Sequence, residues 1–198
     1  MNKSRFEAFS DGVFSFAVTL LVLGIVLPQT RAPSDRDLTA ELIALWPNVV
    51  AYMLSFAVIG IMWQNHHALF RLVERIDRRT VFINLLLLAG TVFVPFATST
   101  LGTYPTMRAS TFLYGMAPTS TSIVFNVLLG HLIRSGTFSA DVTADVIKPT
   151  VKAYRIGLAD YSFATLLALV SPTASFVAYL AIAAYFVVPR GLDSDLQQ

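Results

Sequence analysis

Apolar stretches separated by short charged segments run along nearly the whole chain of 198 residues. A helix that crosses the hydrocarbon core of a bilayer needs about 17–25 mostly apolar residues, and several stretches supply that length. The pattern predicts six transmembrane helices, at residues 6–28, 46–69, 80–101, 109–133, 156–171 and 173–189. The expected fold class is all-α, an integral membrane protein in which residues 1–198 form a single transmembrane domain.

The connections between these helices are short. Ser171-Pro172-Thr173 leaves room only for a tight hairpin between the last two helices. The longest polar connection, 134–155, is expected to hold no more than a short amphipathic piece. The first helix carries Asp11 and is not followed by an Ala-x-Ala cleavage site, so we interpret it as a membrane span and not as a removable signal peptide.

The basic residues predict the orientation of the chain. With the N-terminus inside, eleven Lys and Arg side chains fall on the inner side and three on the outer side, which is a strong positive-inside bias. The inner set is Lys3, Arg5, Arg71, Arg75, Arg78, Arg79, Arg134, Lys148, Lys152, Arg155 and Arg190, and the outer set is Arg31, Arg36 and Arg108. We therefore expect an even number of helices and a multi-pass protein of the cell membrane with both termini in the cytoplasm.

Composition excludes several other classes of protein. Hydrophobic residues make up 55% of the chain and charged residues 13%, whereas about a quarter of the residues of a soluble domain are charged. The net charge of +2 gives no indication of nucleic-acid binding. The lack of cysteine excludes disulfides and thiolate chemistry. We expect no enzyme and no cofactor, because the sequence has no Gly-x-Ser-x-Gly, His-Glu-x-x-His or phosphate-binding glycine motif. The usual potassium-filter motif, Thr-Val-Gly-Tyr-Gly, is also missing.

Several polar residues are predicted at one depth, in the inner third of the membrane. They are Ser10 and Asp11 in the first helix, Asn65, His66 and His67 in the second, Asn84 in the third and Asp160 in the fifth. A carboxylate within a span costs roughly 2.5–3.5 kcal/mol, less near the interface, so Asp11 is expected to have partners. Three interpretations stay open: hydrogen bonds that keep the helices in register, a proton-sensitive latch based on histidine, and a metal site. Adjacent histidines point about 100° apart on a helix, which argues against the metal. His131, near the inner end of the fourth helix, is expected at the interface.

The first helix also carries an apolar stripe. At 100° per residue, the stripe positions fall within about 40° of one line, with Thr19 about 60° to one side. They are Phe9, Gly12, Phe16, Leu20, Leu23 and Leu27. Periodicity alone favours a stripe that faces lipid or the protein core. A span that is apolar all round does not show which of its sides faces lipid and which faces protein.

Residues 1–100 carry motifs of a known family. Arg5-Phe6-Glu7-Ala8-Phe9-Ser10-Asp11, running on through Gly12 and closing at Pro28, resembles the Arg-x-x-x-Phe-Ser-Asp first helix of the lysosomal potassium channel, transmembrane protein 175, and its bacterial homologues. Further matches are Trp63-Gln64-Asn65-His66-His67-Ala68-Leu69-Phe70, Asn84 and Pro95-Phe96-Ala97-Thr98. Beyond residue 100 the resemblance rests on helix count and spacing.

The resemblance implies a homotetramer in the lipid bilayer, with a central pore lined by the first helix and closed by hydrophobic constrictions. The family's lining positions fall on Phe16, Thr19, Leu20 and Leu23, and the stripe adds Leu27. Phe16 is a departure, because the family more often has an aliphatic residue there. The resemblance also implies a structural or gating network on the side of the first helix that faces away from the pore. Its members are Arg5, Phe9, Ser10, Asp11, Trp63, His66, His67 and Asn84.

The resulting hypothesis is a potassium-permeable leak channel of weak to moderate selectivity. Rings of apolar side chains would gate it by excluding water, and the Thr19 hydroxyl would assist a partly dehydrated ion. The alternative is a proton-coupled secondary transporter that uses Asp11 and the histidines of the second helix, although the sequence lacks the inverted repeats and interrupted helices of such carriers. A non-conducting membrane scaffold is the third class.

Overall fold

The computed structural model describes residues 2–27 and 34–187 of the chain, and the regular elements among them are all helical. They are α1 (Lys3–Leu20), the 3-10 helix η1 (Leu21–Gly24), α2 (Asp35–Ala44), α3 (Trp46–Arg71), α4 (Arg78–Thr103), α5 (Arg108–Ser135), α6 (Ala144–Leu167) and α7 (Pro172–Val187). The all-α class predicted from the sequence is therefore confirmed for the described part of the chain.

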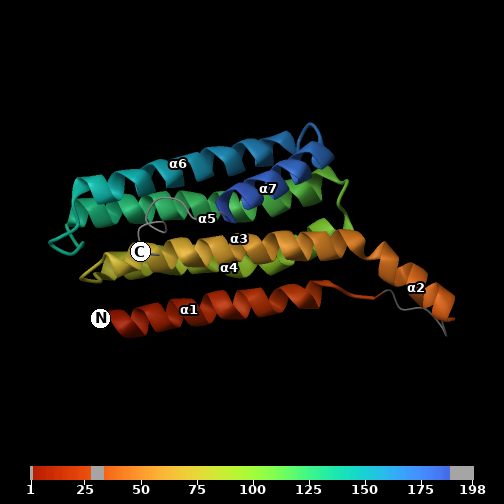
Figure 1. The fold of residues 1–198 in the computed structure, drawn as a ribbon, viewed down its shortest axis with the longest axis horizontal. Helices are drawn as coiled ribbons and strands as arrows, with labels where there is room; N and C mark the ends of the chain where they lie inside the picture. Colours follow the sequence, from red (N-terminus) through yellow and green to blue (C-terminus); the bar gives the residue numbers. More distant parts are fainter. Residues whose placement is uncertain (1, 28–33, 188–198) are drawn as a thin grey trace.

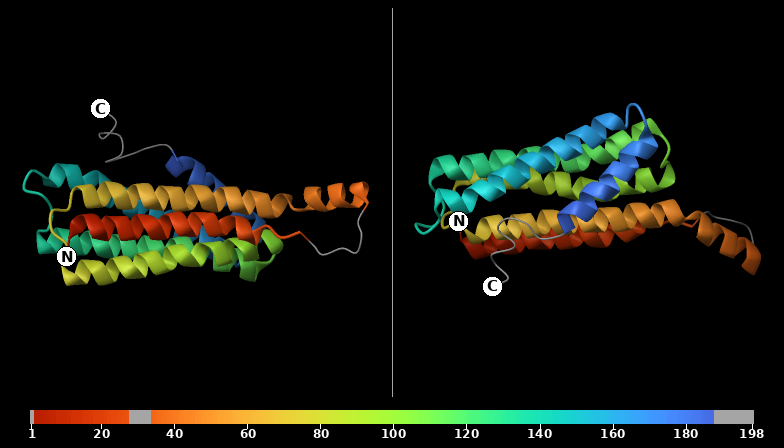
Figure 2. Two further views of the ribbon diagram at one scale, coloured as in Figure 1. Left: turned by 90° about the horizontal axis from the view of Figure 1, so that it is seen from below. Right: turned by 45° about the horizontal axis from the view of Figure 1, so that its top comes forward.

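The long helices run roughly side by side in a bundle (Figure 1). Helices α3 and α4 form its middle, α5, α6 and α7 lie on one side of them, and α1 lies on the other side. Seen from below, α1 lies against both α3 and α4 (Figure 2). Because the other helices are all on the far side of α3 and α4, one face of α1 is left without a neighbour in the protomer.

Four of the described helices are long and apolar enough to cross a membrane, namely Lys3–Gly24, Trp46–Arg71, Arg78–Thr103 and Arg108–Ser135. Helix α7 is apolar but has only 16 residues. Helix α6 has 24 residues but carries charges in its first half. The protein is therefore an all-helical membrane protein with four clear candidate spans, followed by the pair α6 and α7.

Basic residues gather at one end of the bundle, which we call the basic end. It holds the start of α1, the α3–α4 connection and the α5–α6 connection, and Figure 1 shows all three at the same end. The two connections are joined there, because the Glu74 amide donates to the Thr137 carbonyl (2.9 Å) and the Ser139 amide to the Leu72 carbonyl (2.9 Å). Arg36 and Arg108 lie towards the other end, and Arg31 and Arg190 fall outside the described residues.

Helix α6 begins at Ala144, so the prediction that it begins at residue 156 and that 134–155 is a connection was wrong. The charged residues Lys148, Lys152 and Arg155 lower the mean hydropathy of this segment, so the apolar pattern did not indicate a helix there. Their spacing of four and three residues places them on one face, which is the pattern of an amphipathic helix. The observed connection between α5 and α6 is therefore short.

Other boundaries also differ from the prediction. The first helix begins at Lys3 and ends as η1 at Gly24, not over 6–28. Helix α7 begins at Pro172, one residue before the predicted start, and its predicted end at residue 189 lies outside the described residues. Helix α2 was not predicted at all, although Ser34 and Asp37 form a capping box at its start, a known signal for a helix N-terminus. None of its residues is buried, and it projects beyond the bundle at the end opposite the basic end (Figure 1).

Candidate functional site

The predicted stripe of the first helix coincides with the face of α1 that has no neighbour in the protomer. Exposed positions on α1, η1 and the residues that follow include Phe9, Gly12, Phe16, Thr19, Val22, Leu23, Val26 and Leu27. Leu23 is the most exposed large side chain among them, at 69%. The opposite face is at most 3% exposed and consists of Phe6, Ser10, Phe14, Ala17 and Leu21. Leu20, at the edge of the stripe, is half-buried. The rest of the apolar stripe is free to contact another protomer or a lipid, or to line a pore.

The exposed face is wider than the predicted stripe, and the helix changes from α to 3-10 at Leu21. A 3-10 helix has three residues per turn, so positions beyond Leu20 no longer follow the 100° spacing of an α-helix. Val22, which a uniform α-helix turns away from the stripe, is 53% exposed, and Val26 is 67% exposed. The outward surface at this end thus contains Val22 and Val26 besides Leu23 and Leu27.

Thr19 adds one polar group to this face. Its hydroxyl donates to the Phe16 carbonyl of the same helix at 2.8 Å. Because the hydrogen is used in that bond, the lone pairs of Oγ1 are left as acceptors. The exposed face of α1 therefore offers an oxygen ligand to a cation at one level, between apolar side chains.

On the buried face, Ser10, Asn84 and His66 form a hydrogen-bonded chain that joins α1, α4 and α3. The Asn84 amide nitrogen donates to Ser10 Oγ (3.0 Å), and Ser10 Oγ donates to the Phe6 carbonyl (3.1 Å). His66 Nε2 lies 2.9 Å from Asn84 Oδ1. Since Oδ1 can only accept, Nε2 carries the hydrogen in this arrangement. All three residues are at most 1% exposed, so the chain holds three helices in register inside the protomer.

The His66 ring is surrounded by aromatic side chains. Ring centroids of Phe70, Phe14 and Phe6 lie 4.5, 5.4 and 6.3 Å from it. A ring that is enclosed in this way and 1% exposed is shielded from water in the protomer. The environment of His66 therefore suits a neutral structural hydrogen-bond donor.

Asp11 belongs to a second, separate group. Trp63 Nε1 donates to Asp11 Oδ1 at 2.9 Å, and the Trp63 ring stacks with the ring of His67 at a centroid distance of 5.9 Å. Trp63 and His67 are both exposed, unlike the members of the buried chain. The structure thus brings the predicted partners together in two groups, one buried and one at the surface, and not in one network.

The remaining predicted members lie in neither group. The Asn65 carbonyl accepts a hydrogen bond from the Tyr154 hydroxyl (3.1 Å), and Asp160 is a half-buried residue of α6. Arg5 and Phe9 are exposed and line a groove between α1 and α4. Among the residues that the structure describes, no group of three His, Asp or Glu side chains comes close enough to hold a metal ion.

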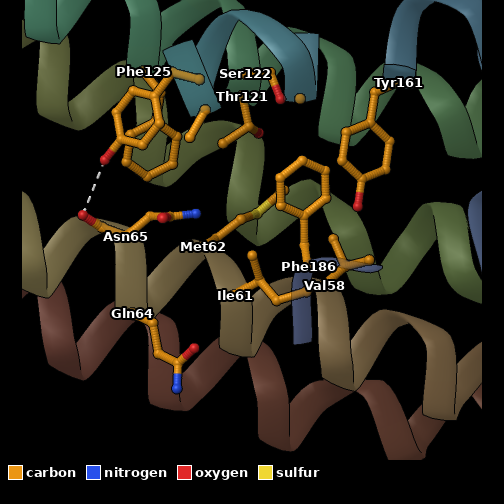
Figure 3. A pocket seen from close by; sticks show the side chains of 13 residues that line it. Val58, Ile61, Met62, Gln64, Asn65, Thr121, Ser122, Phe125, Tyr161 and Phe186 are labelled. Carbon is orange, nitrogen blue, oxygen red and sulfur yellow. Dashed lines mark hydrogen bonds between the residues drawn. The ribbon is translucent and has the colours of Figure 1, made fainter. Parts of the chain in front are cut away.

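A small cavity lies inside the protomer between α3, α5, α6 and α7 (Figure 3). Polar groups of Asn65, Thr121, Ser122 and Tyr161 line it together with apolar side chains such as Met62. Its volume is about 80 Å³, which is room for only a few water molecules. No residue of α1 lines it, so this cavity and the exposed stripe are separate features.

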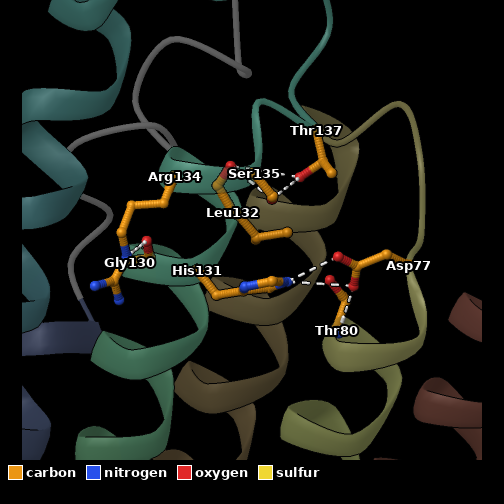
Figure 4. A network of polar contacts seen from close by, with 8 residues as sticks. All are labelled: Asp77, Thr80, Gly130, His131, Leu132, Arg134, Ser135 and Thr137. Carbon is orange, nitrogen blue, oxygen red and sulfur yellow. Dashed lines mark hydrogen bonds and ion pairs between the residues drawn. The ribbon is translucent and has the colours of Figure 1, made fainter.

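At the basic end, Asp77 joins the start of α4 to α5 (Figure 4). Its carboxylate accepts from the Thr80 amide (2.6 Å) as the N-cap of α4 and lies 3.0 Å from Nε2 of His131. The Thr80 amide is the main reason that the pKa of Asp77 is held below its usual range, with His131 contributing less. His131 was predicted at the interface, but no sequence pattern indicated Asp77 as its partner.

We expect Asp77→Ala to lower the stability of the protein at neutral pH by about 1 kcal/mol, because it removes the N-cap of α4. A carboxyl group with a lowered pKa in the folded state stabilises the fold above its unfolded pKa, and this contribution disappears as pH falls through the folded pKa. The difference in melting temperature between wild type and variant should therefore shrink below about pH 4. Asp141→Ala, which removes an exposed carboxylate, is the control and should change little. An equal, pH-independent loss in both variants would contradict this role of Asp77.

The family model for the endosomal/lysosomal potassium channel TMEM175 matches residues 5–95, which contain α1, α3, the buried chain and the Asp11–Trp63 pair. The chain is similar to a potassium channel of Streptomyces collinus, with 38% identity over 192 residues that cover 94% of this chain and 92% of that protein. The endosomal/lysosomal proton channel TMEM175 of Homo sapiens is 39% identical over 103 residues, which are 49% of this chain and 20% of that protein.

A crystal structure of a TMEM175 homologue from Chamaesiphon minutus, described as a lysosomal potassium-selective channel homologue, has the same fold. The TM-score is 0.81 at 38% sequence identity, and the match covers 93% of this chain and 95% of that chain. The helix arrangement, the residues of the first helix and the nearly full-length relatives therefore agree, and the chain belongs to the TMEM175 family.

Proposed function

We propose that the protein is a potassium-permeable channel in which four copies surround a central pore lined by α1. The observation that carries this proposal is the apolar face of α1, which lies at the edge of the protomer and has no neighbour there although it contains Phe16, Leu23 and Leu27. Relatives that match almost the full chain are named as potassium channels, which is not an enzymatic function. The proposed orientation has six helices crossing the membrane and the basic end in the cytoplasm.

The pore is placed between protomers because, in the part of the chain that the structure describes, the cavity enclosed by α3, α5, α6 and α7 is too small to be an ion path. The internal cavity holds only about 80 Å³, and no residue of α1 lines it. A closed cyclic assembly brings one copy of the same helix face to the axis from every protomer. The number of four copies is what the family resemblance implies, whereas the choice of the lining face rests on the exposed residues of α1.

In this arrangement conduction is controlled by rings of side chains at successive levels. Leu20, Leu23 and Leu27 offer no ligand to an ion, so a narrow ring of any of them blocks ions by excluding water. The Thr19 hydroxyls form one polar ring that can accept a partly dehydrated potassium ion. The Phe16 rings narrow the path on the cytoplasmic side of Thr19, which favours weak to moderate selectivity.

The surroundings of the polar residues favour a channel over a proton-coupled transporter. His66 is enclosed by phenylalanine rings, and Asp11 already accepts a hydrogen bond from Trp63. A carrier needs titratable groups that water reaches alternately from the two sides, and neither residue is placed in that way in the protomer. We therefore assign the buried chain and the Asp11–Trp63 pair to structural support of α1.

Ion flux into liposomes that contain the purified protein tests the function. Under a potassium gradient, a channel should give an uncoupled potassium flux that exceeds the sodium flux. Proton flux is measured in the same vesicles, because the human relative is named as a proton channel. A saturable flux that requires a proton gradient would support the transporter, and no flux in correctly assembled protein would support the scaffold.

Cysteine accessibility tests the pore-lining face, and the native chain has no cysteine to interfere. We expect water-soluble thiol reagents to modify and block channels with cysteine at Phe16, Leu20 or Leu23. Ala17→Cys and Leu21→Cys are matched controls on the same helix, because these positions are at most 1% exposed, and they should resist modification. If the exposed positions resist water-soluble reagents but react with lipid-soluble ones, α1 faces lipid and the proposed pore is wrong.

A further inference from the structure

The first half of α6 combines positive charge and an apolar groove in a way that the proposed conduction does not use. Lys148, Lys152 and Arg155 lie four and three residues apart, and at 100° per residue they share one face within about 60°. All three side chains are exposed. They line a groove of about 630 Å³ together with apolar residues of α5 and α6.

The groove has a charged part and an apolar part in a definite order. Ile147 and Val151 stand beside the cations, and Ile133 near the end of α5 lines the groove with them. Ile156 and Ala159 continue the groove along α6, away from the basic end. Along a helix that rises about 1.5 Å per residue, Lys148 and Ala159 are about 17 Å apart. A ligand that fills the groove therefore needs a negative group at one end and an apolar chain at the other.

The cations have few partners in the protein. Lys148 forms an ion pair with Asp145 at 2.8 Å, but both side chains are more than 70% exposed, so this pair is weak. Among the residues that the structure describes, no acidic side chain forms an ion pair with Lys152 or Arg155. The planar guanidinium of Arg155 is suited to bind two phosphate oxygens at once, and the long Lys side chains can reach the headgroup level from a deeper position.

The length and place of α6 put this groove at the membrane surface. Its 24 residues span about 36 Å, about 6 Å more than the roughly 30 Å of the hydrocarbon core. With this extra length at the basic end, the first turn of α6 extends into the headgroup region, and the long side chains of Lys148, Lys152 and Arg155 reach towards it from below. Figure 1 shows α6 on the side of the bundle opposite α1. If α1 surrounds the axis, α6 faces the lipid at the perimeter of the assembly.

We propose that this groove binds one anionic phospholipid of the inner leaflet, with its phosphate on Lys148, Lys152 and Arg155 and an acyl chain along Ile156 and Ala159. A water-soluble macromolecule would satisfy the charges but would not reach the apolar part of the groove within the membrane. This proposal goes beyond conduction, although the exposure of α6 to lipid rests on the proposed assembly around α1. The site itself lies on the other side of the protomer from α1.

Lipid titration of the purified full-length protein in detergent tests this site. We expect phosphatidylglycerol to raise the melting temperature more than phosphatidylcholine and to remain bound in native mass spectra. Lys152→Gln and Arg155→Gln should each weaken the apparent affinity for phosphatidylglycerol roughly fivefold, which corresponds to one charge near an anionic headgroup. Ala159→Trp keeps the three charges but fills the groove, and it should also weaken binding.

Two controls separate a specific lipid site from general attraction. A variant with Arg71, Arg75 and Arg79 replaced by glutamine removes three exposed charges from the same end of the protein but none from the groove, so it should bind phosphatidylglycerol like wild type. Inorganic phosphate should not reproduce the stabilisation, because it lacks the acyl chain. An equal loss in the control variant, an equal effect of phosphate, or unchanged binding in Lys152→Gln, Arg155→Gln and Ala159→Trp would each overturn the proposal.

Discussion

Replacement of Leu23 by serine should open the pathway to a constant leak. If four Leu23 side chains form a ring, the single substitution changes four positions in the assembly. We assume that each leucine adds about 0.5 kcal/mol to the free energy needed to fill the constriction with water, so that the four together add about 2 kcal/mol. Removing a barrier of this size raises the flux roughly 30-fold. Leu23→Asn should act in the same direction, and both should lower the preference for potassium over sodium.

The measurement is potassium and sodium flux in liposomes that contain equal amounts of assembled protein. Leu166→Ser is a matched control, because Leu166 is similarly exposed (61% against 69%) but belongs to α6, on the other side of the bundle from α1. It should leave flux and selectivity unchanged. If Leu23→Ser conducts like wild type, the constriction does not lie at this level, and a flux increase in both variants would indicate damaged packing instead of an opened gate.

The second large effect is expected from Asn84→Leu, which removes the central member of the buried chain. Ser10 loses the donor on its Oγ, and the buried nitrogen of His66 loses its acceptor. An unpaired buried polar group costs about 1–3 kcal/mol, so the loss should be about 2 kcal/mol or more, and the melting temperature and the yield of assembled protein should fall. Because the chain faces away from the stripe, channels that do assemble should keep the wild-type ratio of potassium to sodium flux.

Trp63→Phe provides the comparison for this prediction. It removes the hydrogen bond to Asp11 and part of the ring that stacks on His67, both at the surface, where water or a headgroup can replace the lost hydrogen bond. We therefore expect a smaller loss of stability than in Asn84→Leu. A normally assembled Asn84→Leu protein with altered ion preference would show that the buried chain acts on the pore directly, and the structural role would have to be abandoned.

Local sequence signals predicted the helices that carry the family motif. The family assignment rested on residues of α1, α3 and Asn84, and it is confirmed by the relatives and by the solved structure. The outward face of α1 follows the predicted stripe as far as Leu20, because an α-helix has a fixed angle per residue. The prediction missed Val22, because the predicted stripe marks only part of the face that α1 and η1 leave uncovered, and α3 and α4 cover only the opposite side.

The division of the polar network was not predictable from depth alone. Equal depth in the membrane places residues at one level, but contact also depends on how each helix is rotated about its own axis. Ser10 points into the protomer and Asp11 towards Trp63, although they are adjacent in sequence. The early start of α6 was missed for a different reason, since a hydropathy pattern treats charged residues as the end of a span even when they share one helical face.

The polar contacts of α1 have a mechanical consequence. Among the described residues, the side-chain hydrogen bonds from α1 to other helices involve only Ser10 and Asp11, near the basic end. The rest of α1 and η1, from Val13 to Gly24, packs through apolar contacts and through the close approach of Gly24 to Ser99. A tilt of about 5° around the Ser10 level would move Leu23, about 20 Å away, by nearly 2 Å. Such a tilt would break neither of these hydrogen bonds, but it would have to displace the packing of η1 against α3 and α4. In the proposed tetramer it would change the width of the ring at Leu23.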